Sequence, residues 1–162
     1  MSTATWVKNE LDQCGVSYKE LRHPDAFTAQ EVAHQEHVSG HRVAKVVGVI
    51  ADGRPVELVL PASRRIDLEA VRDILGVEHV RLATETELTR YFTDCEPGAV
   101  PPLRHWQGIP VWMDATMSVE GPIVFQAGTH RDAVRMEFTD WFRLVGPRLG
   151  RFTRPLGTGD DR

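Results

Sequence analysis

The stretch Val43-Ala-Lys-Val-Val-Gly-Val-Ile50 is an apolar run with turn signals on both sides, and it decides the fold. The tetrapeptide Ala51-Asp-Gly-Arg54 predicts a tight hairpin turn, and Val56–Leu60 is the returning strand, which ends at Pro61. Strand side chains alternate between two faces, and both faces of the first strand are apolar apart from Lys45. We therefore expect this strand to lie inside a sheet that is covered on both sides.

Around this hairpin the sequence alternates between helical and strand patterns. Amphipathic spacing and capping signals predict helices at residues 3–14, 28–35, 67–75, 84–92 and 140–145. Short apolar runs predict strands at residues 16–21, 79–82, 109–113, 123–125 and 134–138. A long loop with several prolines and glycines covers residues 93–108. The predicted fold class is α+β, a single domain in which helices flank a mixed, mainly antiparallel sheet.

The chain has 162 residues, of which 41% are hydrophobic, so it is long enough for one domain with its own core. We expect that domain to span residues 1–154 and residues 155–162 to form a flexible tail. No apolar run approaches the roughly 18 residues that a membrane span needs, and no signal peptide is expected. The two cysteines, Cys14 and Cys95, are far apart in the sequence, which fits reduced thiols and a cytoplasmic location.

The net charge of −4 disfavours extensive, nonspecific binding of nucleic acid but allows a small contact with one end of it. The charge is uneven, because residues 143–154 contain four arginines and no acid. We interpret this segment as a solvated, fraying chain end. A contact with phosphate is the alternative interpretation.

Lys45 is the residue of the central strand that needs an explanation, since an ammonium group on an apolar face is costly unless it is paired or reaches water. One interpretation is a lysine on the floor of a pocket, facing an anionic or carbonyl-bearing ligand. The other is a lysine whose stem packs and whose head reaches solvent. Asp114 ends another predicted strand, and it either pairs with Lys45 or caps the following turn.

Several short motifs occur in a characteristic order between residues 16 and 145. They are His23-Pro24 with Thr28-Ala29, Ala44-Lys45-Val46-Val47, Leu60-Pro61-Ala62 before Asp67-Leu68, Leu82-Ala83, Gly98-Ala-Val-Pro101-Pro102, Pro110-Val-Trp-Met-Asp114 and Ala127-Gly128. Together they resemble the YbaK/EbsC-type aminoacyl-tRNA deacylases, which are related to the editing domain inserted in bacterial prolyl-tRNA synthetases.

The resemblance implies a free-standing hydrolase that removes a small, wrongly attached amino acid from the 3′ end of a tRNA and so serves translation fidelity. It implies that Lys45 is the hallmark functional residue and that the glycine-containing loop begins at Gly98. It further implies that a hydroxyl of the terminal ribose assists the attacking water. The implied partners are the aminoacyl-tRNA acceptor end and, as a second candidate, an aminoacyl-tRNA synthetase.

The residue types fit this chemistry, because an activated ester needs a placed water and a stabilised oxyanion rather than a strong nucleophile. Lys45 and Gly98 are the predicted catalytic residues. The resemblance implies Ala99, Pro101, Asp114, Gly128 and His130 as substrate-binding residues, and Thr28, Ala29, Val47 and Thr129 are further candidates for the pocket wall. For Val47 an ordinary core position, and for Thr28 a helix cap, are the alternatives.

Other chemistries have less support in the sequence. The spacing of His34, His37 and His41 lacks the glutamate of the HExxH zinc motif, so we favour a polar surface cluster. Acids on both sides of Cys95 should raise its pKa, which argues against a nucleophilic thiol. We expect no metal, no cofactor and no membrane partner. A binding module of the same fold, which recognises an aminoacyl end or another small ligand without turnover, is the alternative function.

Overall fold

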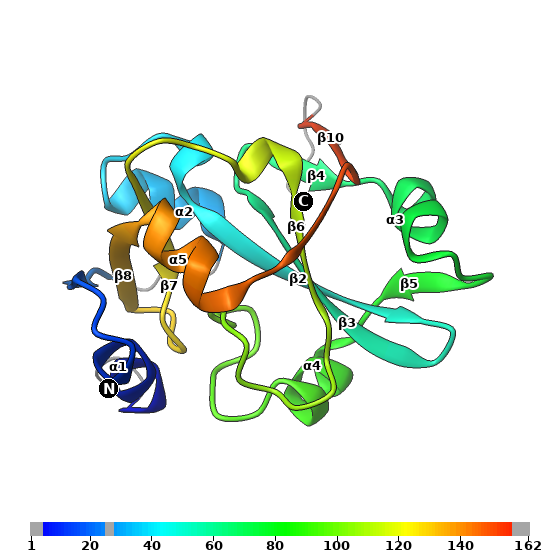
Figure 1. The fold of residues 1–162 in the computed structure, drawn as a ribbon, viewed down its shortest axis with the longest axis horizontal. Helices are drawn as coiled ribbons and strands as arrows, with labels where there is room; N and C mark the ends of the chain where they lie inside the picture. The colour runs from blue at the N-terminus through cyan, green and yellow to red at the C-terminus, as the bar shows by residue number, and fades with distance from the viewer. Residues whose placement is uncertain (1–4, 25–27, 157–162) are drawn as a thin grey trace.

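The computed structural model describes residues 5–24 and 28–156 (Figure 1). Its helices are α1 (Thr5–Gln13), α2 (Ala29–Gln35), α3 (Leu68–Leu75), α4 (Glu85–Tyr91) and α5 (Phe138–Val145), with short 3-10 turns η1 (Gly40–Arg42) and η2 (Ala115–Met117). Its strands are β1 (Tyr18–Arg22), β2 (Ala44–Ala51), β3 (Arg54–Pro61), β4 (Arg64–Ile66), β5 (Val80–Leu82), β6 (Val111–Asp114), β7 (Pro122–Gln126), β8 (Asp132–Glu137), β9 (Arg148–Gly150) and β10 (Thr153–Pro155).

The β2–β3 hairpin forms as predicted, and its turn has the backbone that the sequence requires. Ala51 pairs with Arg54 across the turn, and the two residues between them, Asp52 and Gly53, have φ values of 46° and 81°. Positive φ at both central positions is the geometry that matches the twist of the flanking strands. The hairpin therefore establishes the register that sets Lys45 opposite Leu60.

The strands form three sheets that together match the predicted fold class. A five-stranded sheet has the order β5-β2-β3-β6-β9, a three-stranded sheet the order β1-β8-β7, and β10 pairs with β4. The β3–β6 and β6–β9 pairs are parallel and the other five strand pairs are antiparallel, so the sheets are mixed and mainly antiparallel. In Figure 1, β2 and β3 run through the middle of the molecule, with α2 and α5 near β7 and β8 and with α3 near β5.

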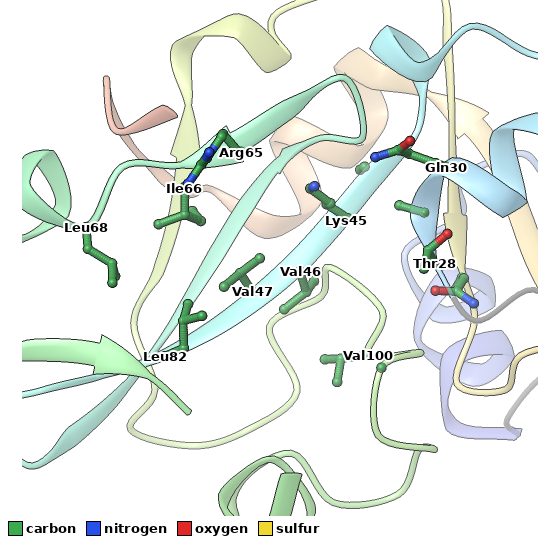
Figure 2. Close-up of a pocket in the computed structure, with 14 residues that line it drawn as sticks. Thr28, Gln30, Lys45, Val46, Val47, Arg65, Ile66, Leu68, Leu82 and Val100 are labelled. Atoms are coloured by element: carbon green, nitrogen blue, oxygen red, sulfur yellow. The ribbon is translucent and has the colours of Figure 1, made fainter. Parts of the chain in front are cut away.

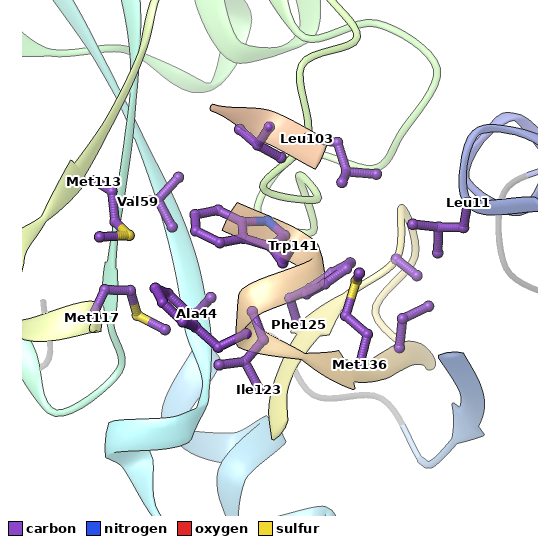
Figure 3. Close-up of a cluster of buried hydrophobic side chains, with 14 of the residues drawn as sticks. Leu11, Ala44, Val59, Leu103, Met113, Met117, Ile123, Phe125, Met136 and Trp141 are labelled. Atoms are coloured by element: carbon purple, nitrogen blue, oxygen red, sulfur yellow. The ribbon is translucent and has the colours of Figure 1, made fainter. Parts of the chain in front are cut away.

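The main core lies where the three- and five-stranded sheets face each other. Trp141 of α5 is fully buried at its centre, with Phe125 and Met136 from the smaller sheet and Val59 and Met113 from the larger one (Figure 3). Burying one large apolar side chain contributes about 1.5–3 kcal/mol, so this cluster holds the two sheets together. The relative position of the two sheets is thereby fixed around the start of β2.

One edge of β2 is left open where the two sheets meet. On this edge β5 pairs only with residues 49–51 of β2, and Val43, just before β2, forms a single bridge with Val124 of β7. Between these contacts, Lys45, Val46 and Val47 have no ladder partner on that edge among the described residues. Their side chains are only half-buried, whereas the rest of β2 is buried. The expectation that the whole strand is covered on both sides is therefore wrong for this segment.

The arginine-rich segment at the end of the chain is ordered into strands. The prediction of a fraying chain end is wrong, because β9 extends the five-stranded sheet and β10 pairs with β4. Pro155, which the sequence assigned to the tail, is the last residue of β10, while residues 157–162 lie outside the described residues. The arginine side chains are exposed, but their backbone is held by strand pairing.

Candidate functional site

The open edge of β2 forms the floor of a cavity of about 280 Å³ (Figure 2). One wall comes from the start of α2, Gln126 of β7 and the loop residues Gly98 and Val100. The opposite wall comes from Arg65 and Ile66 of β4 and from the apolar residues that follow it in α3 and β5. The cavity therefore lies at the junction of all three sheets, where strand pairing is interrupted.

Lys45 lies between these two walls. Figure 2 shows its side chain with Thr28 and Gln30 on one side and Arg65 and Ile66 on the other. Of the two interpretations of this lysine, the cavity position matches the pocket-floor interpretation. The described lining contains two cations, Lys45 and Arg65, and no carboxylate, histidine or cysteine. A site of this composition attracts an anion or the oxygen of a polarised carbonyl.

The loop that carries Gly98 is held in place by the turn after β7. Gly98 has a φ of +84°, and a Cβ atom at this position would lie 3.3 Å from Cε1 of His130. The backbone N–H of His130 donates to Oε1 of Glu96 at 2.7 Å, and the Gly128 N–H donates to the carbonyl of Ala99 at 3.1 Å. Glycine is favoured at position 98, because the positive φ strains any other residue and an added Cβ would press against the His130 ring.

Two backbone donors on this loop are unused in the part of the chain that the structure describes. The N–H groups of Gly98 and Val100 donate to no other group there, although both residues line the cavity. The N–H of Ala99, between them, donates to the carbonyl of Glu96 at 3.0 Å. Unpaired backbone N–H groups beside a pocket are suited to bind a developing oxyanion.

The structure brings together five of the residues that the sequence singled out for the site. The predicted residues that line the cavity are Thr28, Ala29, Lys45, Val47 and Gly98. The predicted residues that lie behind the cavity wall or elsewhere are Ala99, Pro101, Asp114, Gly128, Thr129 and His130. Thr28 also serves as the N-cap of α2, since its hydroxyl accepts a hydrogen bond from the Glu31 N–H at 3.1 Å.

The residues behind the wall support the loop rather than face the cavity. Ala99, Pro101 and Gly128 are buried. Thr129 is 3% exposed, and its hydroxyl donates to Asp132 at 2.5 Å. The Thr129 bond lies within the turn, while the hydrogen bond from the Gly128 N–H to the Ala99 carbonyl joins the turn to the loop.

Asp114 caps a turn and anchors β10, and it does not pair with Lys45. Its carboxylate accepts from the N–H of Phe152 at 2.8 Å and from the hydroxyl of Thr153 at 3.0 Å. It also accepts from the N–H and the hydroxyl of Thr116. Burial raises the pKa of Asp114, but these hydrogen bonds outweigh burial and lower the pKa below its ordinary value. Asp114 is only 2% exposed to solvent, and its carboxylate anchors β10.

Part of the cavity wall had no signal in the sequence. Strand β4 was not predicted, so Arg65 and Ile66 were missed. Leu68 and Leu82 belong to the motifs of the resemblance, but they were not predicted as site residues. The run Ser-Arg-Arg-Ile between two elements has no periodicity. Its strand character comes from pairing with β10, which is remote in the sequence.

The thiol of Cys95 lies outside this cavity and stays protonated. Burial, followed by the nearby carboxylates of Asp94, Glu57 and Glu96, raises the pKa of Cys95 to about 12. The predicted direction of the pKa shift is confirmed, although burial rather than the flanking acids is the main cause.

His34, His37 and His41 are exposed on and after α2. Among the described residues, no helix is both long enough and apolar enough to cross a membrane.

The fold and the cavity define a class of protein, a single α+β domain with a lysine at the floor of a pocket between its sheets. The family model described as the aminoacyl-tRNA editing domain matches residues 23–144, which is more than half of the chain. This chain therefore belongs to the aminoacyl-tRNA editing domain family, as its sequence motifs suggested. Among proteins with curated descriptions, none matches the sequence significantly.

Solved structures share the fold at low sequence identity. The hypothetical protein APE2540 superposes with a TM-score of 0.82 at 19% identity, over 91% of this chain and 99% of its own. A candidate trans-editing enzyme for prolyl tRNA synthetase superposes with a TM-score of 0.82 at 22% identity, over 93% of this chain and 96% of its own. At these identities the likeness establishes the fold alone.

Proposed function

We propose that this protein is a free-standing aminoacyl-tRNA deacylase that hydrolyses the ester linking a small, wrongly attached amino acid to the 3′ end of a tRNA. The observation that carries the proposal is the presence of Lys45 and Gly98 in one cavity whose described lining contains no acid. Membership of the editing-domain family supports the same activity. A solved structure of the same fold is described as a candidate trans-editing enzyme for prolyl tRNA synthetase, and the proposal assigns the same kind of activity to this chain.

In this reaction a water oxygen adds to the ester carbonyl carbon, the bond to the ribose oxygen breaks, and a proton passes to that oxygen. The ammonium of Lys45 and the N–H groups of Gly98 and Val100 stabilise the negative charge on the carbonyl oxygen. The described lining supplies no carboxylate, histidine or thiol as a base. As the family resemblance implies, a hydroxyl of the substrate's own terminal ribose orients the water and relays its proton, taking the water proton while it passes its own proton to the leaving ribose oxygen.

The size of the cavity favours a small amino acid. Its volume of about 280 Å³ lies just below the range of typical ligand pockets, which is roughly 300 to 1,000 Å³. Part of this space is taken by the terminal ribose, so little remains for the side chain. A synthetase discriminates weakly against amino acids smaller than its own, because one methylene contributes only about 1–3 kcal/mol to the difference in binding. A small editing pocket admits these smaller amino acids for hydrolysis and excludes the correct, larger one.

The test is to incubate the protein with tRNAs charged with alanine, serine, threonine, cysteine or proline and to follow loss of the ester. Wild-type protein should hydrolyse at least one small aminoacyl species, and Lys45→Ala should abolish this activity. Lys19→Ala is the matched control, because Lys19 is exposed on β1, outside the cavity lining. A melting curve for each variant separates lost chemistry from lost folding.

Saturable binding of charged tRNA without ester loss across the whole panel would contradict the enzyme and would support a binding module instead. Activity that depends on an added synthetase would identify that synthetase as a partner. The cytoplasmic location stays a prediction from the reduced cysteines and from the substrate.

A further inference from the structure

The cavity has a basic rim on the side of β4 and β10. These two strands are antiparallel, and their register sets Arg65 directly opposite Arg154. Directly opposed residues of an antiparallel pair project from the same face, with Cβ atoms roughly 4.5–5.5 Å apart. Arg65 lines the cavity, so Arg154 extends the same positive surface outward from it.

The pairing concentrates two positive charges at the rim of the cavity, where they attract an anion. Arg154 is exposed and forms no ion pair with the described residues. Its neighbour Arg151 is also exposed, and no acid occurs between residues 143 and 154. The positive charge is therefore local, in a chain whose net charge is −4.

Other contacts show which part of this strand pair is structural. Arg64 donates from Nε to the hydroxyl of Thr153 at 3.0 Å and from a terminal nitrogen to its carbonyl at 3.1 Å. Asp114 anchors the same threonine through its hydroxyl. Arg64, Thr153 and Asp114 thus hold β10 against β4, and Arg154 has no part in that network.

The remaining sides of the cavity are less suitable for a phosphate. Glu31 follows the lining residue Gln30 on α2, and Glu96 lies two residues before Gly98 on the loop. After β4, Asp67 is occupied as the N-cap of α3, where it accepts from the Ala70 N–H at 3.2 Å, and Glu69 lies in the first turn of that helix. The basic rim is therefore the electrostatically favoured path into the cavity.

We propose that the Arg65–Arg154 pair binds a backbone phosphate of the single-stranded RNA end whose terminal nucleotide occupies the cavity. The proposal rests on the proposed function, since an aminoacyl-tRNA carries a phosphodiester immediately beside its terminal nucleotide. Whenever the ester lies near Lys45, that phosphate must lie near the mouth of the cavity. A guanidinium pair of this kind recognises phosphate by charge-assisted, bidentate hydrogen bonds.

The experiment measures binding of a labelled RNA hairpin with a single-stranded ACCA 3′ end over a series of salt concentrations. Arg154→Glu should weaken binding at least tenfold at low salt, and the slope of log K against log salt should fall by about 0.7 for the lost phosphate contact. Arg143→Glu is the control with the same change of charge. Arg143 is exposed on α5, and its Nη1 lies 3.6 Å from Oδ1 of Asp140, so its charge is already paired. Its binding and slope should stay close to those of wild type.

Folding and function are separated by two further readouts. Arg154→Glu places a carboxylate opposite Arg65, so its melting temperature should stay the same or rise while RNA binding falls. In the deacylation assay the same variant should raise KM and leave kcat nearly unchanged. Arg154→Ala should show a smaller loss of binding in the same direction.

Wild-type affinity and KM in Arg154→Glu would overturn the phosphate site and leave the deacylase proposal intact. Absence of measurable RNA binding by the wild-type protein would also overturn it. Binding that depends on Arg154, in a protein that hydrolyses no charged tRNA, would support the phosphate site and contradict the deacylase.

Discussion

Lys45 and Glu57 are two charged residues on neighbouring strands of one hairpin, yet their surroundings are opposite. Lys45 is half-buried and lines the cavity, at a point where one edge of β2 has no ladder partner among the described residues. Glu57 is 1% exposed and lies between Gly48 of β2 and Val111 of β6. Neither of its carboxylate oxygens has a hydrogen-bond partner among the described residues.

The two residues also differ in strand pairing, which the pattern of residues along each strand does not reveal. Strand β3 is paired on both edges at Glu57, and the Glu57 side chain is buried inside the protein. Burial raises the pKa of Glu57 well above its ordinary value, against the lowering effect of Arg104 and with a further increase from Glu10. An ionisable residue in a strand thus lines a binding cavity where the sheet is open, and it is buried with a raised pKa where the sheet is closed.

The largest expected effect comes from replacing each of these residues with methionine, which keeps a similar shape without the charge. Lys45→Met should lower the deacylation rate by about 10²- to 10³-fold, as loss of one oxyanion-stabilising group does. Glu57→Met should retain the rate within about twofold, because Glu57 does not line the cavity. Single-turnover hydrolysis of the charged tRNA measures the deacylation rates of both variants. A strong loss of rate in Glu57→Met would contradict the proposed difference between the two residues.

The loop beside Lys45 gives the second largest effect. Gly98→Ala should lower activity about tenfold, because Ala strains the backbone and displaces the loop against His130. Gly53→Ala is the matched control, since Gly53 has a φ of +81° and nothing within 4 Å of the added carbon. Both variants should lose a comparable stability of about 1–2 kcal/mol. Equal activity in the two variants would show that the loop does not position the substrate.

The third effect is on stability and its dependence on pH. Glu57→Met removes a buried, unpartnered polar group and should raise the free energy of unfolding by about 1–3 kcal/mol. Since the pKa of Glu57 is raised in the folded state, its protonated form contributes stability below the unfolded pKa of about 4.3, and that stability is lost as the pH rises. In urea denaturation between pH 5 and pH 9, the free energy of unfolding of the wild-type protein should therefore decline as the pH rises, and this decline should be smaller in Glu57→Met.

Asp114 should give the smallest effect and the opposite sign. Its pKa is lowered in the folded state, so its contribution is present above the unfolded pKa of about 3.9 and is lost as the pH falls. Asp114→Asn should lower the free energy of unfolding by about 1–2 kcal/mol at pH 7, and its difference from wild type should shrink as the pH falls below the unfolded pKa and through the lowered folded-state pKa. A difference that persists undiminished in acid would mean that shape rather than charge holds β10.

Much of the local structure could be predicted because its signals lie within a few residues of one another. The turn at Asp52 and Gly53, the cap at Asp67 with Gly76 after the helix, and the capping box of Thr84 and Glu87 all form as the sequence indicated. Lys45 was identified as a pocket residue because a lone cation in an apolar strand requires an explanation. The motif order also indicated the editing-domain family that the family model matches.

The sequence by itself determined the hairpin, the helix caps, the family and the presence of an unusual lysine, since each depends on chemistry between near neighbours. Only the tertiary structure decided which edge of β2 stays open, that Glu57 is sealed from solvent, and that Arg65 faces Arg154. These features depend on pairing between strands far apart in the chain, where hydrophobic packing of the two sheets outweighs local preference. The same packing made an anchor of Asp114 and ordered the arginine-rich end beside the cavity.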